Sequence, residues 1–167
     1  MPATPQDLFA FLDRLGIEHT TVSHPPLFTV EQSRGLRGSI PGGHTKNLFL
    51  KDTRDATFLV VALEDAAINL KTLHHRLEAG RFSFGSAALM RELIGIEPGS
   101  VTPFAVINDK SSRVTVVLDD VMMEQRRLNY HPLVNTMTTT IARDDLVRFL
   151  TATGHAPRIL KVSQETD

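Results

Sequence analysis

The spacing of apolar residues along the chain predicts several amphipathic helices. Near the N-terminus, Leu8, Phe11, Leu12 and Leu15 recur at the positions that share one helix face. The preceding segment 4–7 reads Thr-Pro-Gln-Asp, which is typical of a helix start, because threonine caps the first turn and proline fits the first helical position. Similar signals predict helices at 29–35, 69–77, 86–94 and 142–150, with Gly16, Gly95 and Gly154 placed to end three of the helices.

Short runs rich in β-branched residues predict strands between these helices. The run 44–51 is polar at its beginning, the run 57–63 is apolar throughout, and the turn residues 52–55 separate them. This arrangement is typical of an antiparallel hairpin. A second hairpin is predicted from the runs 101–107 and 114–118 around the turn 108–112, and single strands are predicted at 18–23 and 136–141.

The order of these elements indicates the fold class. Helices and strands are mixed without strict alternation, which favours an α/β (α+β) fold with a mixed, mostly antiparallel sheet packed by helices. With 167 residues and no visible repeat or linker, the chain is expected to form one domain spanning 1–167.

Composition narrows the classes of function. Eighteen Lys and Arg residues against nineteen Asp and Glu give a net charge of −1, which argues against wrapping of DNA or other long duplexes but leaves a local contact with an RNA end open. The absence of cysteine excludes disulfides, thiolate metal sites and a cysteine nucleophile. The N-terminus lacks a signal-peptide pattern, and no apolar run approaches the roughly 20 residues that span a bilayer. We therefore expect a soluble cytoplasmic protein with no membrane partner.

The first segment that could carry chemistry is His44-Thr45-Lys46-Asn47, between a glycine-rich connection and a buried strand. Lysine offers three donors and a positive charge, which suit a phosphate, and the asparagine amide can both donate and accept. Judged on composition alone, a solvated strand end is the more common explanation of such a segment.

The second segment is the glycine- and proline-rich turn 95–103. Backbone N–H groups in tight turns of this kind can point at an anion or at a carbonyl oxygen. An ordinary helix-to-strand connection explains the composition equally well.

The third segment, 129–135, holds the only tyrosine of the chain and a histidine, His131, directly before a proline. A histidine in extended backbone at this place could hydrogen-bond a substrate hydroxyl or orient a water molecule. Taken by itself, it is more simply a structural histidine at a strand end.

Other sites find no support in the sequence. His74 and His75 are adjacent and therefore point to different faces of their predicted helix, and no known metal-ligand spacing occurs elsewhere. No serine lies in a nucleophile-elbow context. We expect neither a metal ion nor a cofactor.

Taken in order, the three segments resemble a known family. Gly43-His44-Thr45-Lys46-Asn47-Leu48-Phe49-Leu50-Lys51-Asp52 resembles the signature stretch of the YbaK-like aminoacyl-tRNA editing domains. Segment 98–104 is similar to the glycine-proline loop of that superfamily, and His131-Pro132 with Asn135, Thr138 and Thr139 is similar to its third block. Within the superfamily the chain most resembles the freestanding prolyl-tRNA editing proteins of the ProX or PrdX type.

This resemblance implies a fold and an activity. The implied fold is a mixed sheet curled into a barrel-like core with surrounding helices. The implied activity is hydrolysis of the ester in mischarged alanyl-tRNA(Pro), and a related branch removes cysteine from tRNA(Pro) instead. A non-catalytic module that binds a tRNA end or a nucleotide remains an alternative. The expected partner is the aminoacylated 3′ end of tRNA(Pro), and binding of prolyl-tRNA synthetase itself stays open.

The resemblance also implies roles for individual residues. Lys46 is expected to pair with a phosphate of the terminal adenosine, and Asn47 and His131 to position the terminal ribose or the water. Because the chain offers no obvious strong base, the substrate's own 2′-hydroxyl is expected to help activate the water. The backbone N–H groups of Gly99, Ser100, Val101 and Thr102 are expected to hold the carbonyl or a ribose hydroxyl, and Leu27, Phe28, Thr29, Val30, Phe49 and Pro103 to form the side-chain pocket.

Overall fold

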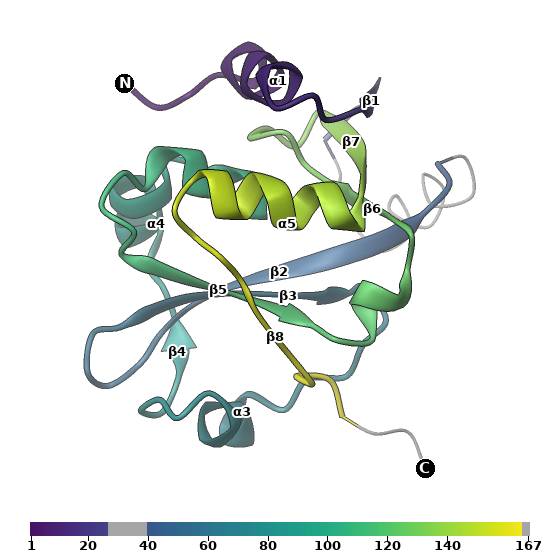
Figure 1. Cartoon of the computed structure of the whole chain (residues 1–167). Helices are drawn as coiled ribbons and strands as arrows, with labels where there is room; N and C mark the ends of the chain where they lie inside the picture. Colours follow the sequence, from purple (N-terminus) through teal and green to yellow (C-terminus); the bar gives the residue numbers. More distant parts are fainter. Residues whose placement is uncertain (27–39, 165–167) are drawn as a thin grey trace.

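One mixed sheet of eight strands organises the chain in the computed structural model, which describes residues 1–26 and 40–164 (Figure 1). The strands follow the order β1-β7-β6-β2-β3-β5-β8, and β4 pairs with β2. Four pairs are antiparallel (β1–β7, β2–β3, β2–β4 and β6–β7) and three are parallel (β2–β6, β3–β5 and β5–β8), which confirms the predicted mixed, mostly antiparallel sheet. The bounds are β1 His19–Ser23, β2 Gly43–Lys51, β3 Thr57–Leu63, β4 Ser83–Phe84, β5 Val114–Asp119, β6 Arg127–Tyr130, β7 Met137–Ala142 and β8 Arg158–Leu160.

Local sequence signals begin and end the helices as predicted. In the first helix, the Thr4 hydroxyl accepts from the N–H of Asp7 while the Asp7 carboxylate accepts from the N–H of Thr4, and Gly16 follows the helix with φ +70°. Asn69 and Ser86 cap the next two helices with their side chains. The described helices are α1 Pro5–Arg14, α3 Leu70–Arg76, α4 Ala87–Ile94 and α5 Arg143–Ala152, with short 3-10 helices η1 Pro103–Asn108 and η2 Met122–Glu124. The helix predicted at 29–35 lies outside the described residues.

The sheet separates two apolar cores. α1, α4 and α5 lie on one side of it and α3 on the other (Figure 1). Because successive side chains of a strand face opposite sides, Phe49 of β2 packs into the larger core, while its neighbour Leu50 packs into the smaller core beside α3. The predicted hairpin 44–63 is confirmed, with β2 antiparallel to β3 and β3 buried along nearly its whole length.

The second predicted hairpin is wrong. Residues 103–108 form the 3-10 helix η1 instead of a strand, and β5 lies parallel to β3. Thr102 accepts from the N–H of Phe104 and Pro103 fills the first helical position, so this segment carries helix-start signals. Its apolar residues are buried on all sides, and a short continuous apolar run does not distinguish a strand from a buried helix.

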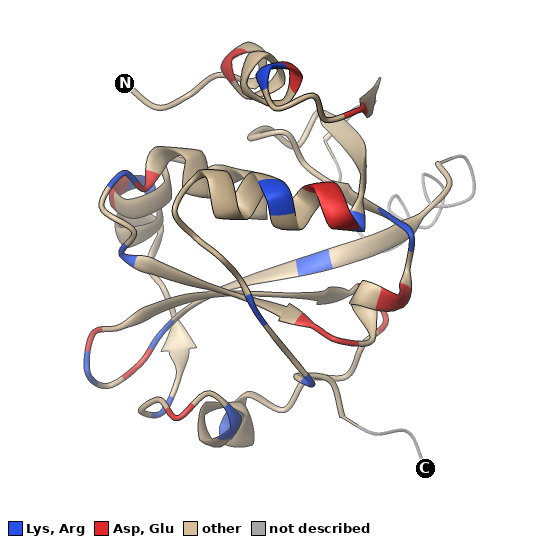
Figure 2. Ribbon diagram, viewed as in Figure 1, with Lys and Arg blue, Asp and Glu red and all other residues tan. Residues whose placement is uncertain are grey.

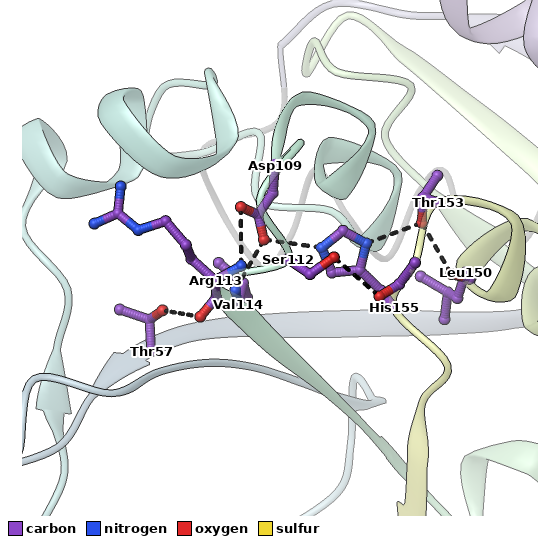
Figure 3. A network of polar contacts seen from close by, with 9 residues as sticks. Thr57, Asp109, Ser112, Arg113, Val114, Leu150, Thr153 and His155 are labelled. Atoms are coloured by element: carbon purple, nitrogen blue, oxygen red, sulfur yellow. Dashed lines mark hydrogen bonds and ion pairs between the residues drawn. The ribbon is translucent and has the colours of Figure 1, made fainter.

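A buried histidine–aspartate pair joins η1 to the end of α5 (Figure 3). The Asp109 carboxylate accepts from the N–H groups of Arg113 and Val114 and lies 2.8 Å from Nε2 of His155. The carboxylate only accepts, so Nε2 of His155 donates to it, and Nδ1 of His155 lies 3.0 Å from the Thr153 hydroxyl. Both side chains of the pair are almost fully buried.

Charges are otherwise dispersed. Figure 2 shows segments of both signs interspersed over the ribbon, while β3 carries no charged residue. None of the described helices combines the length and the apolar character that crossing a membrane requires.

Candidate active site

A break in strand pairing marks the candidate site on β2. One edge of β2 is paired with β3 from Thr45 to Lys51. The other edge pairs with β6 only at Gly43 and His44, and with β4 only at Leu50 and Lys51. Among the described strands, none pairs with this edge between residues 45 and 49. We call this stretch of edge the β2 opening.

The main chain of Asn47 faces the β2 opening. The carbonyl of Phe49 accepts from the N–H of Gly85 at 2.9 Å on this edge. Since backbone groups of alternate strand residues point to the same edge, the N–H and C=O of Asn47 point there too. The side chain of Asn47 also holds an unused group, because its Oδ1 is buried without a partner among the described residues. A buried acceptor without a donor costs stability, which is a common signature of a binding position.

Lys46 extends from the other face of β2. It shares the face of Leu48 and Leu50, which pack toward α3. Its Nζ donates to the carbonyl of Ala66, in the connection between β3 and α3. Ala66 also lines a pocket of about 620 Å³, together with Gly42, Gly43, His44, Gln125 and Ser163. Glu64 and Asp65 line the same pocket, beside the carbonyl of Ala66 that accepts from the ammonium group.

His131 directly follows β6, which pairs in parallel with β2 at Gly43 and His44, at one end of the β2 opening. Its Nδ1 lies 3.0 Å from the carbonyl of Met137. A carbonyl only accepts, so Nδ1 carries the hydrogen and Nε2 of the neutral ring keeps its lone pair. Burial lowers the pKa of His131; the hydrogen bond to Met137 opposes this shift, and the nearby His24 reinforces it. At neutral pH the ring is therefore an acceptor, able to hold a hydroxyl group or a water.

Asn129 ties the glycine-rich connection to β6. Its amide Nδ2 donates to the carbonyls of Pro41 and Gly43 at 3.1 and 3.3 Å, and its Oδ1 accepts from the Thr140 hydroxyl. The Thr45 hydroxyl donates to the carbonyl of Asn129 at 2.7 Å. These bonds fix the beginning of β2 against β6 and so set the width of the β2 opening at that end.

The glycine-proline loop approaches the same region. A Cβ built on Gly99 would lie 3.7 Å from Nδ2 of Asn135, and the ring of Phe104 packs edge-on against Tyr130 with centroids 5.8 Å apart. Gly99 has φ +95° and is exposed. The structure therefore brings together the three segments that the sequence singled out.

Within that loop the expected donors are not all available. The N–H of Ser100 donates to the carbonyl of Glu97 at 3.1 Å, so Ser100 is occupied. No described residue accepts from the N–H groups of Gly99, Val101 or Thr102. The side chains of Thr102 and Pro103 are buried in the start of η1, and Phe49 is 3% exposed in the larger core. Of the expected pocket residues, Leu27, Phe28, Thr29 and Val30 lie outside the described residues.

One neighbour of the site was not anticipated. The ring of His24 lies 6.3 Å from that of His131, centroid to centroid, and Nε2 of His24 lies 2.8 Å from the Thr138 hydroxyl. The antiparallel pairing of β1 with β7 brings these residues together. Two prolines follow His24 and are typical of the end of a strand, but they give no signal of this contact. Over the described part of the chain, no three histidine or carboxylate side chains converge as metal ligands would.

Comparison with known proteins agrees with this arrangement. The sequence profile of the aminoacyl-tRNA editing domain matches residues 24–149. Prolyl-tRNA synthetase associated domain-containing protein 1 of Danio rerio is 38% identical over 93% of this chain and 85% of its own length. Prolyl-tRNA editing protein ProX of Acetoanaerobium sticklandii is 31% identical over 94% of this chain and 96% of its own.

A solved structure shares the fold. The crystal structure of a candidate trans-editing enzyme for prolyl tRNA synthetase superposes with a TM-score of 0.73, covering 99% of this chain and 100% of that chain at 15% identity. The profile match spans most of the chain, and both relatives align along nearly their full lengths. The chain belongs to the aminoacyl-tRNA editing domain family.

Proposed function

We propose that this chain acts in trans on mischarged tRNA(Pro), hydrolysing the ester of alanyl-tRNA(Pro) and releasing alanine and the intact tRNA. The observation that carries the proposal is the β2 opening, where an unused amide oxygen of Asn47 and the neutral ring of His131 flank an unpaired strand edge. The similarity to the editing protein ProX over nearly both full lengths supports tRNA(Pro) as the RNA. The proposal takes residues 1–167 as one editing domain that works in the cytoplasm, where tRNA is charged.

Alanine as the target follows from the limits of size discrimination. A synthetase pocket built for proline rejects the smaller alanine only weakly, because missing methylene groups cost about 1–3 kcal/mol of binding. A second site that admits alanine and excludes proline by size supplies the missing accuracy. The β2 opening is the place proposed for this second site.

The residues divide the work of binding and chemistry. Lys46 holds a phosphate of the RNA 3′ end, because its ammonium is a charged donor beside the pocket that Ala66 lines. The N–H groups of Gly99, Val101 and Thr102 are the available donors for the ester carbonyl, as no described residue accepts from them. Asn47 Oδ1 accepts from the α-ammonium of the aminoacyl group. His131 Nε2 accepts from the attacking water or from the ribose 2′-hydroxyl.

The reaction consumes one water. The water oxygen attacks the carbonyl carbon, and its proton passes to His131 Nε2 directly or through the 2′-hydroxyl. Collapse of the tetrahedral intermediate breaks the bond to the 3′-oxygen, which takes the proton back. The products are alanine and a tRNA with a free 3′-hydroxyl.

The role of the 2′-hydroxyl has its own test. A tRNA(Pro) that ends in 2′-deoxyadenosine and carries alanine on its 3′-hydroxyl should be hydrolysed much more slowly than the normal ester. If the two esters are cleaved at equal rates, His131 acts on water alone and substrate assistance is wrong.

Competition between amino acids tests the substrate. Alanyl-tRNA(Pro) and cysteinyl-tRNA(Pro), mixed in equal amounts with limiting protein, should lose alanine faster, and His131→Ala should slow both. Preferential release of cysteine would move the chain to the cysteine-removing branch. Retention of both esters, with tRNA still bound, would support a non-catalytic binding module.

A further inference from the structure

His24 contacts both sequence neighbours of Met137, the residue whose carbonyl orients the His131 ring. Its backbone N–H donates to the carbonyl of Thr136 at 2.9 Å, and its ring Nε2 lies 2.8 Å from the hydroxyl of Thr138. Between them, the carbonyl of Met137 accepts from Nδ1 of His131. The segment 136–138 is therefore held at two points by a single residue, on either side of the carbonyl that the His131 ring uses.

Hydrogen-bond roles leave one arrangement for the neutral His24 ring. Its Nδ1 lies 2.8 Å from the carbonyl of Pro25, which only accepts, so Nδ1 carries the hydrogen. Nε2 then accepts, and the Thr138 hydroxyl donates to it. Both nitrogens are occupied in this way, so His24 has no group left for a substrate. The His24 ring lies 6.3 Å from the His131 ring, centroid to centroid, and its partner Thr138 is buried. His24 is therefore placed to support the structure around His131.

We propose that His24 is a positioning residue for His131. By clamping Thr136 and Thr138 it fixes the carbonyl of Met137, which selects the tautomer of His131 with its hydrogen on Nδ1 and aims the bare Nε2 at the substrate. Loss of the ring bond to Thr138 leaves only the backbone bond to Thr136, which loosens the carbonyl of Met137, and the His131 ring then redistributes between its two tautomers. A ring with hydrogen on Nε2 cannot accept a proton there. The catalytic consequence rests on the proposed function, whereas the effect on the tautomer does not.

The tautomer can be read without any enzyme assay. The ¹⁵N shifts of the His131 ring in the full chain distinguish a protonated Nδ1 from a protonated Nε2. The wild type should show hydrogen on Nδ1, and His24→Ala should add a population with hydrogen on Nε2. His24→Gln should restore the wild-type pattern, because its amide can still meet the Thr138 hydroxyl. Thr138→Val removes the same bond from the other side and should match His24→Ala, which also covers the case that His24→Ala does not fold.

Deacylation kinetics supply the second readout. His24→Ala should lower kcat by about 10- to 100-fold, the usual cost of losing a residue that orients a functional histidine, with little change in KM. In a His131→Ala background the same change should have no further effect. His19→Ala is the matched control, because His19 begins β1, the strand that His24 directly follows, but its ring bonds to Asp13 at 2.9 Å and stacks on Phe9.

The outcomes separate the two proposals. An unchanged His131 tautomer in both His24→Ala and Thr138→Val overturns the positioning role, whatever the activity. Altered tautomers in a protein that hydrolyses no aminoacyl-tRNA support the positioning role and overturn the proposed substrate. Altered tautomers together with a lower kcat, and recovery of both in His24→Gln, support the two together.

Discussion

Lys46 and Asn47 are neighbours in sequence, yet their side chains leave β2 from opposite faces. Asn47 shares its face with Phe49 of the larger core, and Lys46 shares its face with Leu50 of the smaller core. The Lys46 ammonium reaches the carbonyl of Ala66, while the Asn47 oxygen stays buried without a partner among the described residues. The two residues therefore serve different parts of a substrate, and their substitutions should have separable effects.

Removal of the Lys46 ammonium should weaken RNA binding. Lys46→Ala should reduce kcat/KM by about 10- to 100-fold, chiefly through KM, because a charge-assisted hydrogen bond contributes about 1.5–3 kcal/mol. Loss of one phosphate contact should also reduce the slope of log affinity against log salt by about 0.7. Lys51→Ala is the control on the same strand, since Lys51 already faces Asp55 at 3.6 Å. An unchanged salt slope in Lys46→Ala would show that this lysine touches no phosphate.

Replacing Asn47 should raise the stability of the protein and lower its activity. Asn47→Leu removes a buried acceptor that has no donor among the described residues, so the free energy of unfolding should rise by about 1 kcal/mol. The same change should reduce kcat, because the group proposed to meet the aminoacyl ammonium is lost. Urea unfolding and deacylation rates measure the two effects. Asn108→Leu is the contrasting control, as its amide is satisfied by Ala3 and Ile94 and its loss should destabilise. A destabilised Asn47→Leu would contradict this interpretation.

The pH at which activity falls on the acid side should be lower than the pKa of an ordinary histidine. Burial is the main cause that lowers the pKa of His131 in the folded protein. The neutral ring is the active form, so kcat/KM is constant above the pKa and falls as pH drops through it. Because that pKa is lowered, activity should persist below pH 6.5, about the value of an unperturbed histidine. Rates measured between about pH 5 and pH 8 decide this, and half-maximal activity above pH 6.5 contradicts it.

The buried pair of Asp109 and His155 should govern stability and leave chemistry alone. His155→Ala should lower the free energy of unfolding by about 1.5–3 kcal/mol, because the buried Asp109 carboxylate loses its hydrogen bond from Nε2. Well below the unfolding temperature, kcat/KM should stay within about twofold of the wild type. Ser112→Ala removes only the exposed bond to the carbonyl of Gly154 and should cost about 1 kcal/mol or less. Equal losses in the two variants would show that the buried hydrogen bond between His155 and Asp109 has no special role.

Signals confined to a few neighbouring residues predicted the structure well. The capping box at Thr4 and Asp7 and the glycine at 16 define the first helix as expected. The hairpin 44–63 follows from a turn between two runs of opposite character. In these cases the residues that determine the element lie within the element itself.

Elements defined by distant partners could not be predicted in this way. β6 and β8 are four and three residues long and exist through pairing with β7, β2 and β5. The apolar run 101–107 predicts a strand, because the burial of residues 103–107 on all sides hides the helical period. Length and continuous apolarity do not reveal which of the two structures tertiary packing selects.

The candidate site shows the same division between features that local sequence predicts and features that depend on distant partners. The identities of Lys46, Asn47 and His131 could be proposed from the sequence, but their geometry depends on strand pairing. His24 reaches Thr138 across 114 positions of sequence through the β1–β7 pair, so no local pattern announces it. That Ser100 is already hydrogen-bonded to Glu97 likewise emerges only from the folded loop.

We propose that this chain removes alanine from tRNA(Pro) and spares proline. The most direct measurement follows the release of labelled amino acid from alanyl-tRNA(Pro) and from prolyl-tRNA(Pro) by the purified full-length chain under identical conditions. We predict rapid release of alanine, loss of that release in His131→Ala, and proline release no faster than the uncatalysed reaction. Comparable release of proline, or alanine release that matches the protein-free control, would contradict alanine-specific editing by this chain.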